Sequence, residues 1–362
     1  MAAFREGRVM KVIERSDRIV RAEIEIGMDH VEAVGFPSML GPLEPGDRVV
    51  ANTTGVDLQL GTGGVAFLLW NLDGPDSLEP GAGHIIKMRY TPWQTEVLAV
   101  ESPESVRHDD LVAVSSIDGM PVVACGLHSQ IAGVAAGIKE RRPDAVVGYI
   151  MTDGGALPLA WSRLVRSLQQ EGLIDFTCTV GHAFGGDLEA VNVFSGLAAA
   201  HVVGGADVTI VGMGPGLAGT STTLGFSGIE QGQVLDAATA LGGRPVACLR
   251  VSFADSRPRH RGISHHTITA LTIAAHTRAT VAIPDLPQEL SDTLWDQLRS
   301  HGISDRHVMV SAEGRPGMRL LETKGVDVTS MGIAMVDAPE GVLAAAAAGV
   351  VATEAISGAE SV

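Results

Sequence analysis

Short runs of alternating hydrophobic and polar residues, each bounded by Gly, Pro or Asp, dominate the first hundred residues of the chain. Such alternation places apolar side chains on one face of a β-strand, and the bounding residues favour turns. The clearest runs occupy residues 7–14, 19–26, 47–51 and 65–70. We therefore expect a small β-barrel or β-sandwich domain over residues 1–100.

Beyond about residue 120, apolar runs alternate with segments of helical periodicity. This alternation predicts a mostly parallel sheet with crossover helices. The predicted strands are residues 121–125, 145–151, 174–180, 207–212, 245–251, 279–283 and 306–310. They favour a doubly wound α/β sheet over residues 101–362. A weaker run at residues 326–331 would supply an eighth strand, which leaves a TIM-like barrel as the alternative fold.

Between these two patterns, residues 84–94 gather basic and aromatic side chains in a chain that has few aromatic residues. The side chains are His84, Lys87, Arg89, Tyr90 and Trp93. We interpret this segment as the junction between the two domains. A basic lip over the functional site is the alternative.

The composition is that of a globular protein, with 45% hydrophobic residues among 362 and a formal net charge of −16. Because nucleic-acid binders usually carry a basic face, we expect no nucleic-acid partner. The first residues lack the apolar core of a signal peptide. Three widely spaced cysteines in predicted apolar strands, Cys125, Cys178 and Cys248, are expected to be buried free thiols. These features predict a cytoplasmic location.

An alanine-rich apolar segment covers residues 341–356. The charge of Glu354 and the alanine content favour a buried or interface helix over a membrane-spanning one. We therefore expect no membrane association. Packing of this helix between subunits would make the protein a homo-oligomer.

Polar and glycine-rich residues follow the carboxyl ends of five successive predicted strands. Ligands bind beyond these ends in open α/β sheets and in TIM barrels, so we expect the loops to converge on one site. The third loop contains His182 and Asp187, which are candidates for catalysis because flanking glycines imply a tightly turned backbone around this polar pair. His128 and Asp153, in the first and second loops, are secondary candidates.

The fifth loop holds the densest group of candidate residues, which are Arg259, His260, Arg261, His265 and His266. We expect Ser264 to cap a helix from about His265 to Thr277, which places two of the histidines in its first turn. There the helix dipole disfavours imidazolium and keeps both rings neutral. Neutral imidazole suits metal ligation or proton transfer, and the two arginines would neutralise developing charge on a substrate.

The fourth loop, residues 212–228, contains a formal GxGxxG motif formed by Gly214, Gly216 and Gly219. The motif is weak because a Thr/Ser/Gly run follows it, where a helix should receive a pyrophosphate. The same run has Thr220 where a P-loop has lysine, so nucleotide hydrolysis is poorly supported. We interpret it as an anion-binding loop, whose backbone N–H groups act with the hydroxyls of Thr220, Ser221 and Thr222. A lid or linker is the alternative.

Five motifs along the chain resemble those of a known family. They are GTGG at 61–64, HIIKMRYTP at 84–92, GHAFGGDLEA at 181–190, GPG at 214–216 and HRGISHH at 260–266. In this order they resemble a bacterial family described as a domain of unknown function, DUF3866. The resemblance spans nearly the whole chain, and it implies no activity, cofactor or residue role.

The residues favour an enzyme that acts on a small anionic metabolite bearing a phosphate or a carboxylate. The candidate catalytic residues are His182, Asp187, His260, His265 and His266. In one branch of this hypothesis they transfer protons, with the aspartate as a base or as the group that orients a histidine. In the other they bind a divalent metal, although neither an HExxH nor an HxH signature organises them.

Two other functions stay open. An NAD(P)-dependent oxidoreductase would use the GxGxxG motif, with Glu230 or Asp236 near the position of a ribose-binding acid. A non-catalytic ligand-binding or assembly protein would use the histidines to bind an effector or to sense pH, because a fold does not dictate a function.

Overall fold

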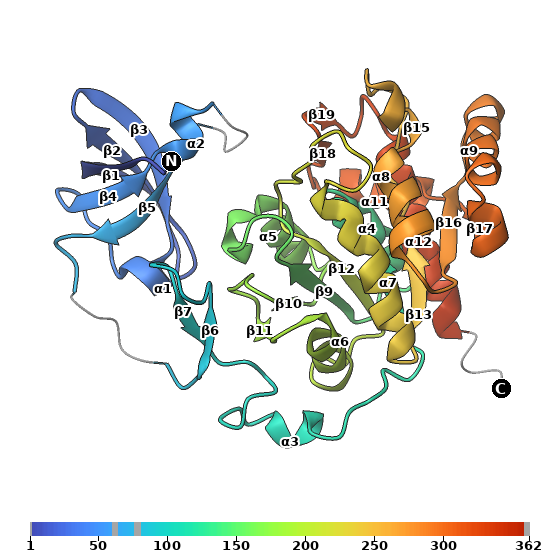
Figure 1. Cartoon of the computed structure of the whole chain (residues 1–362), viewed down its shortest axis with the longest axis horizontal. Coiled ribbons are helices and arrows are strands. Elements are labelled where there is room, and N and C mark those ends of the chain that lie inside the picture. Colours follow the sequence, from blue (N-terminus) through green and yellow to red (C-terminus); the bar gives the residue numbers. More distant parts are fainter. Residues whose placement is uncertain (1, 60–63, 76–80, 358–362) are drawn as a thin grey trace. The chain divides into compact units, whose positions relative to one another are not determined.

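The computed structural model describes residues 2–59, 64–75 and 81–357. Figure 1 labels its helices and strands, which belong to two compact units, Met1–Val97 and Leu98–Val362. Three residues of the GTGG motif, 61–63, lie outside the described ranges. The boundary between the units falls close to the end of the β-rich segment predicted for residues 1–100.

The first unit is built on a closed barrel of five strands. They are β1 (Phe4–Arg15), β2 (Val20–Ile26), β3 (Asp29–Gly35), β4 (Arg48–Asn52) and β5 (Ala66–Asn71). Their order is β1-β2-β3-β5-β4, and β3 pairs with β5 in parallel while the other neighbours are antiparallel. This is the topology of an OB-fold barrel, so the structure selects the barrel from the two architectures that the sequence left open.

Alternating side chains fill this barrel, as the sequence pattern predicts. Val20, Ala22 and Ile24 of β2 are buried and pack with Val49 and Ala51 of β4. The residues between the three apolar positions of β2 are charged. Two short helices, α1 (Pro37–Leu40) and α2 (Thr54–Asp57), precede and follow β4 in the chain.

The segment at residues 84–94 forms most of a hairpin at the end of the first unit. Its strands are β6 (Ile85–Lys87) and β7 (Thr95–Val97), which pair in antiparallel fashion. The segment therefore lies directly before the unit boundary in the chain, as the junction interpretation requires.

The second unit is an α/β structure around an open parallel sheet of eight strands. In chain order these are β8 (Pro121–Ala124), β9 (Val147–Thr152), β10 (Phe176–Thr179), β11 (Leu188–Glu189), β12 (Val208–Met213), β13 (Arg244–Ala247), β16 (Thr280–Pro284) and β17 (Val308–Ala312). Their order across the sheet is β11-β10-β9-β12-β8-β13-β16-β17. The prediction of a doubly wound sheet is confirmed. The TIM-like alternative is wrong, because β11 and β17 are the two edges of an open sheet.

Two predicted elements differ from the structure. Residues 326–331 do not join the sheet, because β18 (Thr329–Ser330) pairs with β19 (Ile333–Ala334) in a separate hairpin. The helix predicted over residues 265–277 is shorter: α8 (His265–Thr269) continues as one π-helical turn, Ala270–Ala274, and then ends. Gly232 of the neighbouring helix touches the backbone at this end, where an added Cβ would lie 2.6 Å from the nitrogen of Ala275.

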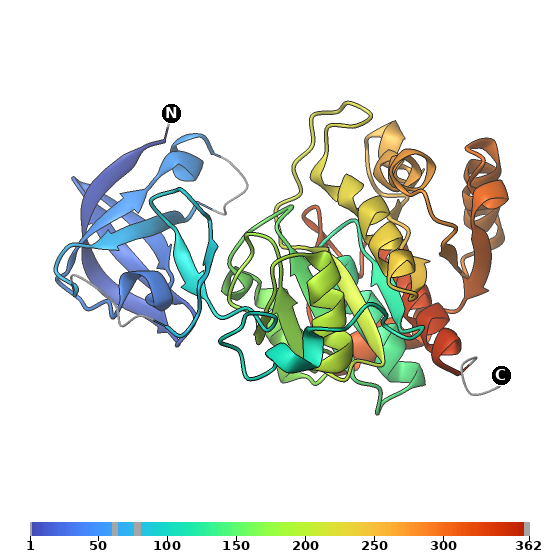
Figure 2. The same ribbon diagram turned by 60° about the horizontal axis from the view of Figure 1, so that its bottom comes forward.

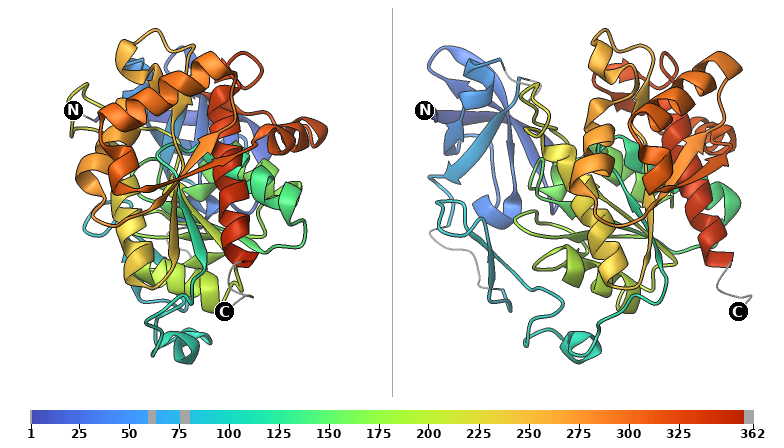
Figure 3. Two further views of the ribbon diagram at one scale, coloured as in Figure 1. Left: turned by 90° about the vertical axis from the view of Figure 1, so that its right-hand side faces the viewer. Right: turned by 45° about the vertical axis from the view of Figure 1, so that its right-hand side comes forward.

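Helices cover both faces of the sheet (Figure 3). One face carries α4 (Gln130–Arg141), α5 (Arg163–Gln170), α11 (Arg315–Thr323) and α12 (Glu340–Ser357). The other carries α6 (Val193–Val202) and α7 (Glu230–Ala240). Figure 2 shows α6 in front of the sheet beside the short helix α3 (His108–Leu111). Helices α9 (Gln288–Ser300) and α10 (Ile303–Arg306) connect β16 to β17.

The alanine-rich segment forms helix α12, and its apolar surface is buried within its own chain. The alanines at 344–348 are fully buried, and the helix packs closely on α4. A Cβ added to Gly137 of α4 would collide with the backbone carbonyl of Ala346. Among the residues that the structure describes, no helix combines the length and the apolar character that a membrane crossing needs. Oligomerisation through α12 stays a prediction.

The connections that leave the carboxyl edge of the sheet alternate between its two faces along the neighbouring strands β9, β12, β8 and β13, so each adjacent pair diverges. After β9 the chain passes to α5 on one face, whereas after the neighbouring β12 it passes to α7 on the other. The same divergence separates β8, which leads to α4, from β13, which leads to α8. Open α/β sheets bind ligands in such crevices. The β9/β12 and β8/β13 crevices are two strand spacings apart, or about 10 Å.

Candidate functional site

The three histidines of the fifth loop lie together in the structure. His260 ends a short 3-10 helix, and His265 and His266 begin α8, which is capped by Ser264 as predicted. Their ring centroids are 4.3 to 5.0 Å apart. The buried hydroxyl of Ser264 lies 2.7 Å from Nδ1 of His260 and accepts a hydrogen bond from the backbone N–H of His266. One serine therefore positions two of the three rings.

The pKa values of all three rings are lowered, which favours their neutral forms, and the largest cause is the partial or full burial of each ring. Burial lowers the pKa of His266 to about 3 and that of His260 to about 4, and the guanidinium of Arg250 lowers both further. The pKa of His265 is also lowered, first by burial and then by Arg259. The predicted neutrality therefore has a different cause from the helix dipole. A group of neutral rings among arginines disfavours any added positive charge.

Arg250 is a candidate binding residue that the sequence prediction did not identify. It is 7% exposed, and its guanidinium donates a hydrogen bond to Nδ1 of His266 at 3.0 Å. Burial lowers its pKa to about 10, so it is still charged at neutral pH. Within the described ranges no carboxylate forms an ion pair with Arg250. The nearby Asp255 is paired with Arg257 instead, at 2.7 Å. A buried, unpaired guanidinium is costly, and an anionic ligand would remove that cost.

The bond from Arg250 fixes the tautomer of His266. A guanidinium only donates hydrogen bonds, so Nδ1 of the ring must accept, and the proton of the neutral imidazole lies on Nε2. His266 therefore offers an N–H group at Nε2 and no lone pair for a metal. The three histidines do bring possible ligand atoms within 4.8 Å of one another. Their tautomer and the surrounding guanidinium groups nevertheless fit an anion better than a divalent cation.

The glycine-rich loop between β12 and α7 lies against this histidine cluster. The ring of Phe226 stacks on His266, with centroids 4.0 Å apart and planes inclined by 5°. A Cβ added to Gly219 would lie 3.9 Å from Nε2 of the same histidine. Arg259 donates a hydrogen bond to the hydroxyl of Ser221 at 3.0 Å. The fourth and fifth predicted loops therefore form one site, whereas the side chain of Arg261 is exposed to solvent.

Residues at the tip of the glycine-rich loop form hydrogen bonds with one another. The N–H of Thr220 donates to the carbonyl of Gly225 at 2.8 Å, and its hydroxyl lies 3.0 Å from both that carbonyl and the hydroxyl of Thr222. Gly225 donates in turn to the Thr222 hydroxyl. The hydroxyl of Thr220, predicted to hold an anion, therefore closes the turn.

Two glycines of the GxGxxG motif, Gly214 and Gly216, serve packing and turning of the chain. A Cβ on Gly214 would collide with the carbonyl of Ala156, and Gly216 has a φ of 102°, which L residues seldom adopt. Helix α7 begins only at Glu230, well beyond Gly219. The loop therefore lacks the strand–turn–helix geometry by which dinucleotide-binding proteins hold a pyrophosphate.

A second polar group occupies the β9/β12 crevice. Glu230, the first residue of α7, accepts a hydrogen bond of 2.5 Å from the hydroxyl of Thr152 at the end of β9. Burial raises the pKa of Glu230 to about 7; the Thr152 bond lowers it and Asp153 raises it. The carboxylate of Asp153 accepts from the backbone N–H of His182 at 2.9 Å. The loops after β9, β10 and β12 therefore meet around Glu230 and Asp153.

Two glycines make room for these carboxylates. A Cβ on Gly154 would lie 2.8 Å from a carboxylate oxygen of Glu230, and a Cβ on Gly181 would collide with the carboxylate of Asp153. Gly181 also has a φ of 64°. The sequence singled out His182 through its flanking glycines and Asp153 through its loop position after a predicted strand, and it gave Glu230 only as an alternative ribose-binding acid.

Asp187 does not lie at the carboxyl edge of the sheet. Its Oδ2 accepts hydrogen bonds from the backbone N–H and the hydroxyl of Thr177, at 2.9 and 2.8 Å, and from Gln169 at 2.9 Å. Thr177 is near the start of β10, and Asp187 directly precedes β11. These bonds fix the start of the two strands. The prediction of a catalytic Asp187 is therefore replaced by a structural role.

His128 links three elements of the fold. Its Nδ1 lies 3.0 Å from the carbonyl of Met213, which can only accept, so Nδ1 carries the proton. Nε2 then accepts from the hydroxyl of Ser162 at 2.6 Å. Burial lowers the pKa of His128 to about 4. Ser162 also caps α5 and is 4% exposed, so its oxygen is not accessible to a substrate and the pair is structural.

The structure is that of a two-unit protein in which an OB-like barrel precedes a doubly wound α/β unit with a polar, arginine-containing site at the carboxyl edge of its sheet. The chain belongs to the family described as a protein of unknown function (DUF3866), whose family model matches residues 32–349. This match confirms the resemblance seen in the five motifs. No curated protein matches the chain.

Proposed function

We propose that this protein is an enzyme that binds a small anionic metabolite at Arg250 and transforms it by acid–base chemistry. The observation that carries the proposal is the buried, unpaired guanidinium of Arg250 at the β8/β13 crevice. A carboxylate or phosphate would provide the missing countercharge and accept the remaining guanidinium hydrogen bonds. The N–H at Nε2 of His266 is a second donor for the same anion.

Glu230 is the residue best suited to move a proton. Its pKa of about 7 means that protonated and ionised forms coexist near neutral pH, which is the condition for an efficient general acid or base. Its crevice is about 10 Å from that of Arg250, a span that one small metabolite can bridge. In this proposal Arg250 and the histidines hold the anionic group, and Glu230 acts at the reacting end. His182 and Asp153 border that end.

The other candidate functions have less support. Glu230 is bonded to Thr152 at the start of a helix, whereas a ribose-binding acid follows a strand of a dinucleotide-binding unit. The geometry of the described residues therefore supports NAD(P) less well than a small anion. A non-catalytic ligand-binding protein would also need Arg250, but it would not need a carboxyl group with a pKa near 7. The three buried free cysteines support the cytoplasmic location that we include in the proposal.

Calorimetric titration of the full chain with inorganic phosphate and with acetate tests the binding step. We expect saturable binding that Arg250→Gln weakens at least tenfold, because the amide lacks the charge. Arg299→Gln is the matched control, since Arg299 is an exposed arginine on α9 that pairs with Asp296. Absence of binding to the wild type, or equal affinity in Arg250→Gln, would overturn the proposal.

The catalytic step is tested separately, by following a mixture of small carboxylates and phosphates by NMR. We expect the wild-type protein to convert at least one anion and Glu230→Gln to convert it about 100-fold more slowly. Binding without conversion of any anion that Arg250 holds would favour the non-catalytic alternative.

A further inference from the structure

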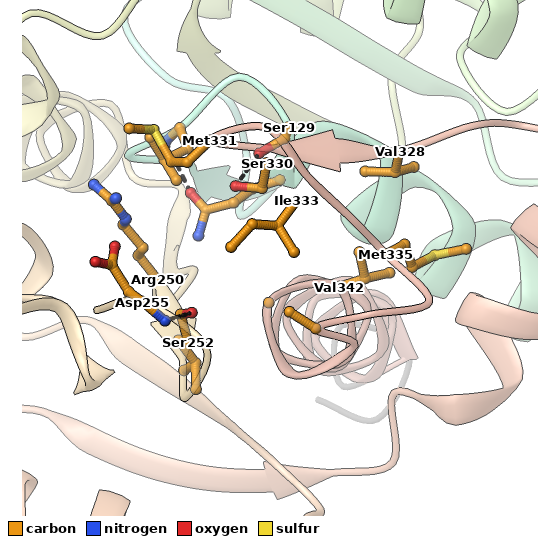
Figure 4. Close-up of a pocket in the computed structure, with 15 residues that line it drawn as sticks. Ser129, Arg250, Ser252, Asp255, Val328, Ser330, Met331, Ile333, Met335 and Val342 are labelled. Carbon is orange, nitrogen blue, oxygen red and sulfur yellow. Dashed lines mark hydrogen bonds between the residues drawn. The ribbon is translucent and has the colours of Figure 1, made fainter. Parts of the chain in front are cut away.

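We infer that the anion carries a short aliphatic chain, which enters a cavity beside Arg250. This inference rests on the proposed function and deepens it by naming the substrate class. The cavity has a volume of about 60 Å³ and lies between the loop after β8, the segment after β13 and the start of α12. Figure 4 shows Arg250 and Asp255 at one side of it and Met335 and Val342 at the other.

The far side of the cavity is apolar. Val328, Met335 and Val342 are buried residues that line it, and Ile333 reaches toward them from the β18–β19 hairpin (Figure 4). Polar side chains, Ser129 and Ser330 among them, border the cavity as well, but water placed against the apolar side chains themselves would lack hydrogen-bond partners. Two or three aliphatic carbon atoms would fill the same space and gain dispersion contacts with the methionine and valine side chains.

The near side of the cavity is positively charged. Arg250 and Asp255 both line it. Asp255 is bound through both carboxylate oxygens by Arg257, at 2.9 and 2.7 Å, and this contact holds the pKa of Asp255 well below its ordinary value. The aspartate charge is thus compensated by its own partner, and that of Arg250 is not. The cavity therefore offers one anion site next to one apolar space.

A short hairpin covers the apolar space. Strands β18 and β19 have two residues each, and Met331 between them adopts a φ of 52°, in the left-handed region that non-glycine residues seldom occupy. The hydroxyl of Ser129 donates to that of Ser330 at 3.1 Å, which joins the hairpin to the start of α4. Because a two-residue hairpin has little stability of its own, its opening would give a chain access to the cavity.

The first experiment is a chain-length series on the wild-type protein. Acetate, propionate, butyrate and hexanoate are titrated by calorimetry, and methyl, propyl and hexyl phosphate form a parallel arm that decides which anionic group is preferred. We expect the affinity to rise roughly fourfold per methylene up to about three carbons and then to stop rising, because the cavity is full.

The second experiment fills the cavity. Ile333→Phe places a larger side chain in the apolar space, and we expect it to abolish the dependence on chain length while acetate affinity stays within about twofold. Val336→Phe is the control on the same segment, because Val336 is 74% exposed and does not line the cavity. This variant should keep the wild-type series.

The outcomes separate the two proposals. Binding of all anions with no rise along the wild-type series would overturn the cavity inference and leave the anion site intact. Failure of every anion to bind would overturn the proposed function itself. Should Ile333→Phe fail to fold, the wild-type series alone decides, because its rise and plateau need no variant.

Discussion

Replacement of Glu230 by Gln should make the free energy of unfolding less dependent on pH. In the folded protein the pKa of Glu230 is about 7, against an ordinary value of 4.5. Between these two values the folded state keeps a proton that the unfolded state has lost. Stability from this group is therefore fully present below pH 4.5 and is lost as the pH rises through 7. Glutamine still accepts the Thr152 hydrogen bond but cannot titrate.

The size of the effect follows from the interval between the two pKa values. Each pKa unit corresponds to about 1.36 kcal/mol, so the change from 4.5 to about 7 gives at most about 3 kcal/mol. The free energy of unfolding of Glu230→Gln, minus that of the wild type, should grow by up to this amount between pH 4 and pH 8. The increase should be concentrated between pH 4.5 and pH 7.

Urea unfolding at unit steps of pH measures this difference. In a background with Trp70→Phe and Trp93→Phe, the remaining tryptophans, Trp161 and Trp295, both report on the second unit. Glu289→Gln, on the exposed start of α9, serves as the control and should show no comparable change. A difference between Glu230→Gln and the wild type that is constant from pH 4 to pH 8 would show that the carboxyl group is not desolvated as described.

Three further predictions concern the histidines, the glycines and Asp187. At pH 5, unfolding of the wild type should take up about one more proton than unfolding of His266→Gln, because His266 has a pKa of about 3 when folded; the pH dependence of urea unfolding measures this uptake. Gly219→Ala should leave the melting temperature nearly unchanged but weaken phosphate binding several-fold, whereas Gly216→Ala should cost about 1 kcal/mol through its φ of 102°. Asp187→Asn should cost about 1 to 3 kcal/mol in unfolding and leave phosphate affinity within twofold; normal stability with lost binding would restore a functional role.

Much of the second unit was predictable because buried parallel strands are continuous apolar runs. Seven predicted runs correspond to seven strands of the sheet. The eighth strand, β11, has only two residues, which is too short for a hydrophobic pattern to be detected. The strand predicted at residues 326–331 is absent from the sheet, although Val326 and Val328 are buried. The order of strands in the barrel was not predictable, since it depends on pairing between distant segments.

The sequence could predict candidate residues that follow the ends of strands. It could not predict a residue whose importance depends on burial without an ion-pair partner. The rule that ligands bind at carboxyl ends of strands located the histidine cluster and Asp153. Arg250 lay inside a predicted strand, and its importance follows from burial without a carboxylate, which no sequence pattern shows. Asp187 was assigned to the wrong edge of the sheet, because flanking glycines indicate a turn but not whether the turn lies at the start or at the end of a strand. Our preference for an anion over a metal rests on the tautomer of His266, which the sequence alone does not give.

The close contact between α4 and α12 has a consequence for how the protein is made. These helices are about 200 residues apart in the chain, and α12 also covers β8, β13 and β16. At typical rates of synthesis, about 10 to 40 s separate the appearance of the two segments from the ribosome. During that time one face of the central strands is uncovered and apolar. The growing chain should therefore depend on chaperones until α12 emerges, and early termination before Glu340 should yield aggregates.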